Sequence, residues 1–226
     1  MRGGLSFRAT AVAVLGFAVA MAYLESAVVV YLQGALGTRV GEIFPLRPEI
    51  EAGGLVLIEV GREVATLVMI AGIGVLVGRS RLERLAWAAI VFGAWDIGYY
   101  AWLQLFSGWP GSPGTVDLLF LIPVPWVGPV WSPIVVSGAL VGFGLAAASR
   151  LWSGGRLFVT RRNWVAGIVG GLFVILSYTL DAGRLTDGGL PGPYPWPAFA
   201  VGMLLAVSAA VDSLRGAAPR GAPRND

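Results

Sequence analysis

Long apolar stretches dominate this chain, and short segments rich in Arg, Gly or Pro separate them. At a rise of 1.5 Å per residue, about 20 residues of helix are needed to cross a hydrocarbon core of ~30 Å. Stretches of about this length run over residues 9–33, 54–77, 85–106, 134–148, 164–180 and 196–214. The pattern therefore predicts an all-α, polytopic integral membrane protein with six transmembrane helices.

The composition favours the same class and excludes several kinds of site. Hydrophobic residues make up 56% of the 226 residues and charged residues only 13%, whereas soluble domains carry roughly 25% charged residues. The chain has no Cys and no His, which excludes disulfides, thiolate or imidazole metal ligands, and catalytic triads built on either residue. We expect no cofactor, since no phosphate-binding or dinucleotide-binding loop is present. A net charge of +3 spread over dispersed Arg does not indicate nucleic acid binding.

Arginine is distributed unequally between the two sets of connections. If the helices alternate in direction, three arginines lie on one side, namely Arg39, Arg47 and Arg184. Twelve lie on the other: Arg2, Arg8, Arg79, Arg81, Arg84, Arg150, Arg156, Arg161, Arg162, Arg215, Arg220 and Arg224. The positive-inside rule then places both termini in the cytoplasm, with the protein in the inner (plasma) membrane. We expect a single transmembrane domain over residues 1–214 and a short disordered cytoplasmic tail over residues 215–226.

Charged side chains inside the second apolar stretch are the strongest indication of a site. Glu59, Arg62 and Glu63 have the i, i+3, i+4 spacing of one helix face. A charge costs ~2.5–3.5 kcal/mol at the bilayer centre on insertion scales, so this face is expected to point into the bundle. Glu25 lies within the first stretch, and its predicted depth is similar.

A second polar face is predicted in the third stretch. Asp96, Tyr99 and Tyr100 share the same spacing, which places a carboxylate beside two phenols that can donate to it. Asp117 is expected near the external end of the fourth helix. These residues form the candidate buried polar site, whose metal content is left open and to which we assign no catalytic role: Glu25, Glu59, Arg62, Glu63, Asp96, Tyr99, Tyr100 and Asp117.

A proline-rich segment precedes the fourth helix. It contains Pro123, Pro125, Pro129 and Pro133. Proline lacks an amide donor and clashes with the preceding helical turn, so a regular helix is not expected there. We predict a broken or re-entrant external segment over residues 118–130, with Ser132 as N-cap and Pro133 as the first helical residue. Two interpretations stay open: the segment lines the cavity that holds the acids, or it forms a flap at the headgroup level anchored by Trp126 and Trp131.

Four strings within residues 20–135 carry a resemblance to a known group of proteins. They are AYLESAVVVYL, REVATLVM, WDIGYYAWLQLFSGWPGSP and DLLFLIPVPWVGPVWSP. On these strings the chain resembles a family of uncharacterised bacterial multi-pass membrane proteins known only as hypothetical proteins. The resemblance implies no activity, and it supports the view that the acidic face and the proline-rich segment belong to one site.

Three classes of function remain after these exclusions. A small transporter or permease would use the carboxylates and Arg62 to handle protons or a cation. A structural or accessory membrane subunit would use the same network to fix helix register, and an intramembrane carboxylate enzyme, the least favoured class, would use it for acid–base chemistry or to bind a hard cation. The partners we expect are the lipid bilayer and a proton or cation, with a homo-oligomer or partner membrane subunits as further options.

Overall fold

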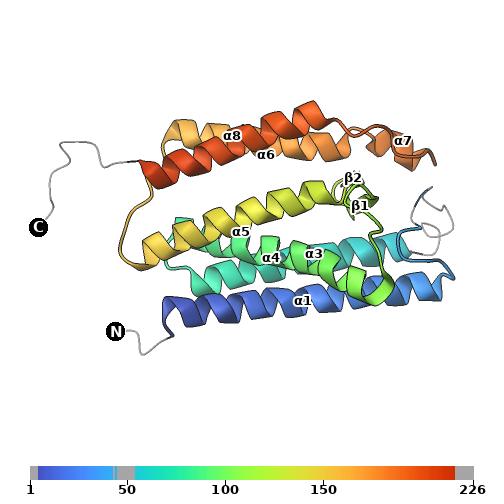
Figure 1. The fold of residues 1–226 in the computed structure, drawn as a ribbon, viewed down its shortest axis with the longest axis horizontal. Coiled ribbons are helices and arrows are strands. Elements are labelled where there is room, and N and C mark those ends of the chain that lie inside the picture. Colours follow the sequence, from blue (N-terminus) through green and yellow to red (C-terminus); the bar gives the residue numbers. More distant parts are fainter. Residues whose placement is uncertain (1–4, 43, 45–53, 217–226) are drawn as a thin grey trace, which may run out of the picture.

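A computed structural model describes residues 5–42, 44 and 54–216 and shows a mostly helical chain (Figure 1). The long helices run roughly side by side along one axis, and the start of α1 and the end of α8 lie at the same end of the molecule (Figure 1). The elements are α1 (Phe7–Ala35), α3 (Leu55–Val77), α4 (Arg81–Ser107), β1 (Val116–Phe120), β2 (Trp126–Pro129), α5 (Trp131–Trp152), α6 (Arg161–Thr179), α7 (Ala182–Thr186) and α8 (Trp196–Arg215).

The six predicted apolar stretches correspond to the long helices α1, α3, α4, α5, α6 and α8. Local signals set several of their starts. Ser6 accepts a hydrogen bond from the Ala9 amide at the start of α1, and Ser80 accepts one from the Glu83 amide at the start of α4. Thr160 and Asn163 form a reciprocal capping box at the start of α6. Such caps satisfy amides that have no partner within the first helical turn.

Helix α4 is the centre of a bundle formed with α1, α3 and α5. It packs against each of these three helices, whereas α6 and α8 pack mainly against each other. Its buried side chains include Trp87, Ile90 and Val91, none of which is exposed at all. Because protein surrounds α4 on several sides, its sequence can be less apolar than that of its neighbours.

Glycine allows the closest helix approaches. A Cβ atom at Gly170 of α6 would lie 2.7 Å from both the Ala206 amide nitrogen and the Gly202 carbonyl oxygen of α8. At Gly93 of α4 it would lie 2.4 Å from the Ser137 carbonyl oxygen of α5. Small residues permit this backbone-to-backbone packing between membrane helices.

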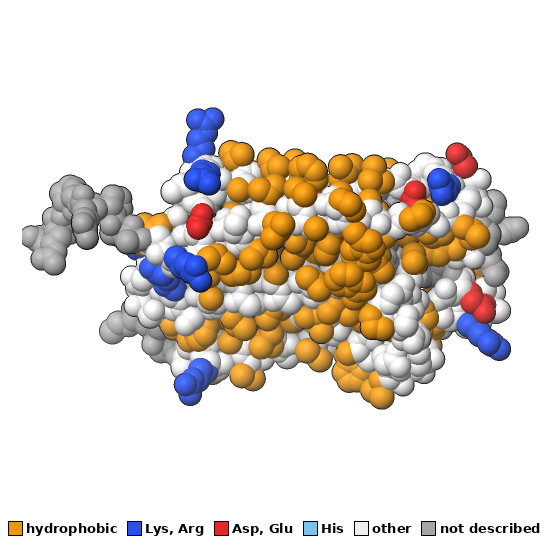
Figure 2. Space-filling model, turned by 45° about the horizontal axis from the view of Figure 1, so that its top comes forward, with side chains coloured by type: hydrophobic (Ala, Val, Ile, Leu, Met, Phe, Trp, Pro, Cys, Tyr) orange, Lys and Arg blue, Asp and Glu red, His pale blue; other side chains and the backbone are white. Residues whose placement is uncertain are grey.

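Within the described residues, five helical segments are long and apolar enough to cross a membrane. They are Phe7–Ala35, Leu55–Val77, Trp131–Trp152, Arg161–Thr186 and Trp196–Arg215. The third predicted stretch, 85–106, forms α4 but is not among them, because Asp96, Gln104 and several Trp and Tyr residues lower its hydropathy. The outer surface is apolar: Leu76 is 82% exposed and Leu204 72%. Figure 2 shows this apolar surface between two ends where charged side chains gather.

The proline-rich segment folds as an antiparallel β-hairpin. Strand β1 pairs with β2, with Val116 opposite Pro129 and an irregularity between Leu118 and Phe120. The expectation that no regular helix forms here is confirmed, but the predicted N-cap is wrong. Helix α5 begins at Trp131, and Ser132 lies inside its first turn, where its hydroxyl donates to the Pro129 carbonyl at 2.8 Å.

Most of the described arginines other than Arg62 lie at the end of the bundle where α1 begins and α8 ends. They are Arg8, Arg79, Arg81, Arg84, Arg150, Arg156, Arg161, Arg162 and Arg215, whereas Arg39 and Arg184 lie at the opposite end. Arg2, Arg47, Arg220 and Arg224 lie outside the described residues, as does the part of the predicted tail beyond residue 216.

Candidate functional site

All eight residues of the candidate site line one cavity of about 430 Å³. It lies between α1, α3, α4 and the β-hairpin, toward the end of the bundle opposite the start of α1 and the end of α8. Thr38 and Glu42, which follow α1, lie at this end of the wall, and Thr66 and Asp96 lie deeper along their helices. Sequence spacing predicted one polar face on α3 and another on α4. The fold places both faces, with Glu25 and Asp117, around the same cavity.

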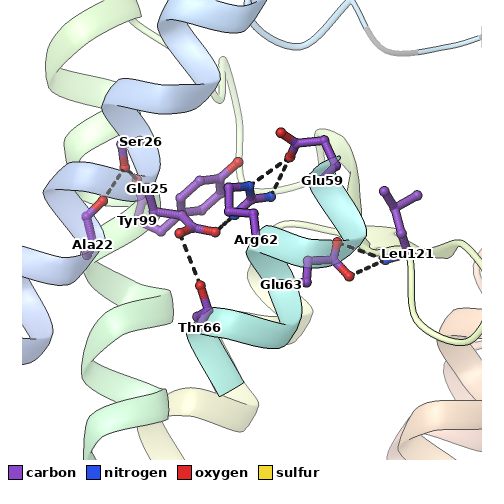
Figure 3. A network of polar contacts seen from close by, with 9 residues as sticks. All are labelled: Ala22, Glu25, Ser26, Glu59, Arg62, Glu63, Thr66, Tyr99 and Leu121. Atoms are coloured by element: carbon purple, nitrogen blue, oxygen red, sulfur yellow. Dashed lines mark hydrogen bonds and ion pairs between the residues drawn. The ribbon is translucent and has the colours of Figure 1, made fainter. Parts of the chain in front are cut away.

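Arg62 is the centre of the polar network (Figure 3). It extends from α3 toward α1 and forms ion pairs with Glu25 of α1 and Glu59 of its own helix. Its Nε donates to Glu59 Oε2 at 2.8 Å, and its Nη2 lies 2.7 Å from the same oxygen. The side chain of Arg62 is 24% exposed and that of Glu25 10%, so this is a largely buried cluster of two acids and one cation.

The same network connects two helices whose backbones make few close approaches. Helices α1 and α3 each pack against α4 but share few direct contacts. The Arg62–Glu25 ion pair spans the space between them, and the Thr66 hydroxyl of α3 donates to Glu25 Oε2 at 3.4 Å. Polar side chains therefore connect α1 to α3 beside the cavity (Figure 3).

Glu63 connects α3 to the β-hairpin. Its two carboxylate oxygens accept a shared hydrogen bond from the Leu121 amide, at 2.9 and 3.0 Å. Leu121 directly follows β1, where the chain turns toward Pro123, so its amide is free of the strand ladder. The carboxylate thus satisfies a backbone donor in the turn and holds the hairpin against the cavity.

Asp96 of α4 and Asp117 of β1 form hydrogen bonds that the sequence did not predict. The Ser137 hydroxyl of α5 donates to Asp96 at 2.8 Å, and the Tyr100 hydroxyl donates to Asp117 at 3.0 Å. The Tyr100 phenol, which its spacing places on the same face as Asp96, donates to Asp117 and not to Asp96. The phenol extends toward β1 instead, because the hairpin places Asp117 beside α4.

Asp117 is the most deeply buried acid of the site, with 2% of its surface exposed. The pKa of its carboxyl is raised to about 7, chiefly by burial and to a smaller extent by the nearby Asp96, while hydrogen bonds from Tyr100 and the Leu118 amide act in the opposite direction. At neutral pH this carboxyl is therefore poised between its two protonation states.

The carboxylates do not converge on a common point. Across the described part of the chain, no group of three or more acidic side chains is placed to hold a metal ion. Glu25 and Glu59 contact Arg62, while Glu63, Asp96 and Asp117 each accept from a different donor. The carboxylates are therefore spread over the cavity wall and do not form a compact oxygen cage.

Sequence reasoning missed several groups that complete the site. Thr66 lies four residues after Arg62 on the same helix face, so spacing could have found it. Ser137 and the Leu121 amide carried no such signal, since each reaches the site only through tertiary folding. Trp95 also lines the cavity.

No protein-family model, curated protein or solved structure matches the chain. The resemblance to uncharacterised bacterial membrane proteins therefore stays a hypothesis, and the proposals below depend on the chain's own residues.

Proposed function

We propose that this chain is a small transporter-like protein of the bacterial inner membrane whose carboxylate–arginine cavity handles protons or a cation. The observation that carries the proposal is the meeting of six acids, Arg62 and two tyrosines in one cavity toward one end of the bundle. Ionisable residues are costly at membrane depth, and where they occur they commonly form ion or proton pathways.

The proposed topology has six spans, with α4 as the third. Its 27 residues correspond to ~40 Å of helix, enough to cross the hydrocarbon core. Its Asp96, Tyr99 and Tyr100 side chains face α5, the hairpin and the cavity. The hairpin supplies Leu118, Leu121 and Pro123 to the cavity wall, which supports the interpretation that this segment lines the site.

Six spans and the unequal arginine distribution lead to one expected result for topology. A fluorescent protein fused after Asp226 should mature in the cytoplasm, and an alkaline phosphatase fused at the same point should be inactive. A phosphatase inserted after Gly188, in the connection between α7 and α8, should be active as a matched control. Active phosphatase at the C-terminus would contradict the six-span topology.

Proton handling is supported by the position of Asp117. Its pKa of about 7 means that it gains or loses a proton within the physiological range. The Tyr100 hydroxyl bonds it to α4, and Asp96 lies on the same helix one turn before Tyr100. Asp117, Tyr100 and Asp96 therefore form a series of polar groups that runs from the hairpin toward the bundle interior.

Proton flux into liposomes tests the proposed function. Liposomes containing the purified protein and a trapped pH-sensitive dye should acidify when a potassium diffusion potential, negative inside, is imposed. Asp117→Asn and Glu59→Gln should strongly reduce the rate, because each removes an ionisable group from the cavity. Asp212→Asn, on α8 at the arginine-rich end, should leave it unchanged.

The same flux measurement addresses a structural or accessory role. Every acid of the site has a partner within the fold, as a network that only fixes helix register would require. Rates equal to those of protein-free liposomes would favour that role and contradict transport.

A further inference from the structure

The cavity wall is mainly apolar around its charged groups. Its apolar members come from three elements, such as Val29 and Leu32 of α1, Val56 and Val60 of α3, and Val124 and Pro125 of the hairpin. Its volume of about 430 Å³ falls within the range of small-molecule sites and is far larger than a dehydrated metal ion or a proton requires. A ligand that fills it therefore needs an apolar body.

The charge of the wall is negative. Arg62 is its one basic residue among the described residues, and it is already shared between Glu25 and Glu59. Glu42, Glu63, Asp96 and Asp117 add further carboxyl groups without any second cation. Even with part of these carboxyls protonated, the cavity favours a positive ligand over a negative one.

Acceptor and aromatic groups suited to a cation are also present. The two Arg62 nitrogens that contact Glu59 both contact its Oε2 atom. Among the described residues, no donor bonds to the Oε1 atom of Glu59. Trp95, Tyr99 and Phe120 lie in the wall, and aromatic rings attract cations over their faces. The acids are held by separate donors, so they present a spread negative field and no compact cage.

We infer that the ligand of this cavity is a monovalent organic cation with an apolar body, such as an aryl or alkyl ammonium compound. This inference rests on the proposed transport function and specifies the cation for it. The apolar wall would hold the body of the ligand, and Glu59 would face its positive charge. Release of the Asp117 proton would provide the compensating charge movement.

Phenyltrimethylammonium and its neutral isostere tert-butylbenzene test the inference, because they share a shape and differ in charge. The melting temperature of the purified protein in a nonionic detergent should rise saturably with phenyltrimethylammonium chloride, by mass action on the folded state. At equal concentration, tert-butylbenzene, benzenesulfonate and sodium chloride should give little shift. A shift equal for the cation and the isostere would overturn the role of charge.

Two variants test whether the cation binds in this cavity. Glu59→Gln should weaken phenyltrimethylammonium about tenfold or more, because it removes the charge proposed to face the ligand. Val60→Trp should reduce binding by filling the cavity while leaving its charges in place. Asp212→Asn should bind like the unaltered protein.

The outcomes separate this inference from the proposed function. No saturable shift with phenyltrimethylammonium in a protein that conducts protons would overturn the inference alone. A cation-specific shift that Val60→Trp abolishes, in a protein without flux, would support the binding site and contradict transport. A shift unaffected by either cavity variant would overturn the inference by placing the cation elsewhere.

Discussion

Replacement of Arg62 by alanine should produce a large loss of stability, a fall of ~10 °C in melting temperature in detergent. Removal of one partner from a buried ion pair typically costs ~3–5 kcal/mol, because the remaining charge stays buried without compensation. A domain of this size loses about 2–4 °C per kcal/mol. Here Glu25 and Glu59 lose their shared cation, and the ion pair between α1 and α3 is lost. Thermal unfolding at neutral pH measures the effect.

The double variant Arg62→Ala with Glu25→Gln separates charge from packing. It also removes the uncompensated carboxylate of Glu25, so it should be more stable than the single Arg62→Ala variant. Arg156→Ala, an exposed arginine between α5 and α6, is the control and should unfold like the unaltered protein. An unchanged melting temperature for Arg62→Ala would mean that the ion pairs do not stabilise the fold.

The second large effect is expected at the contact between α6 and α8. Gly170→Ala places a methyl group 2.7 Å from two backbone atoms of α8, and backbone cannot rotate away as a flexible side chain can. Overpacking of this kind costs ~1–3 kcal/mol. The variant should therefore melt at a lower temperature.

The neighbouring glycine is a matched control with the opposite expected sign. A Cβ atom at Gly171 meets nothing within 4 Å, and alanine in a helix is favoured over glycine by roughly 0.5–1 kcal/mol. Gly171→Ala should thus be neutral or slightly stabilising. Equal destabilisation by both variants would contradict the close α6–α8 packing.

Local pattern was sufficient for the helices and for which side chains share a face. Apolar length predicted the position of all six long helices, and the i, i+3, i+4 rule correctly placed Glu59, Arg62 and Glu63 together on α3. The cost of exposing charge to lipid correctly indicated that these side chains face the protein interior. Proline chemistry correctly excluded helix from residues 118–130.

Partners across elements were decided only by the tertiary structure. The sequence could not distinguish Glu25 from Asp96 as the acid that pairs with Arg62, because the choice depends on how α1 and α3 are arranged around α4. Nor could it show that Tyr100 bonds Asp117 or that Glu63 accepts from the Leu121 amide, since both contacts depend on where the hairpin folds back. The spacing of residues along a helix shows which side chains share one of its faces, and the sequence alone determines that spacing. The cavity depends on packing between residues far apart in the chain, and only the tertiary structure determines that.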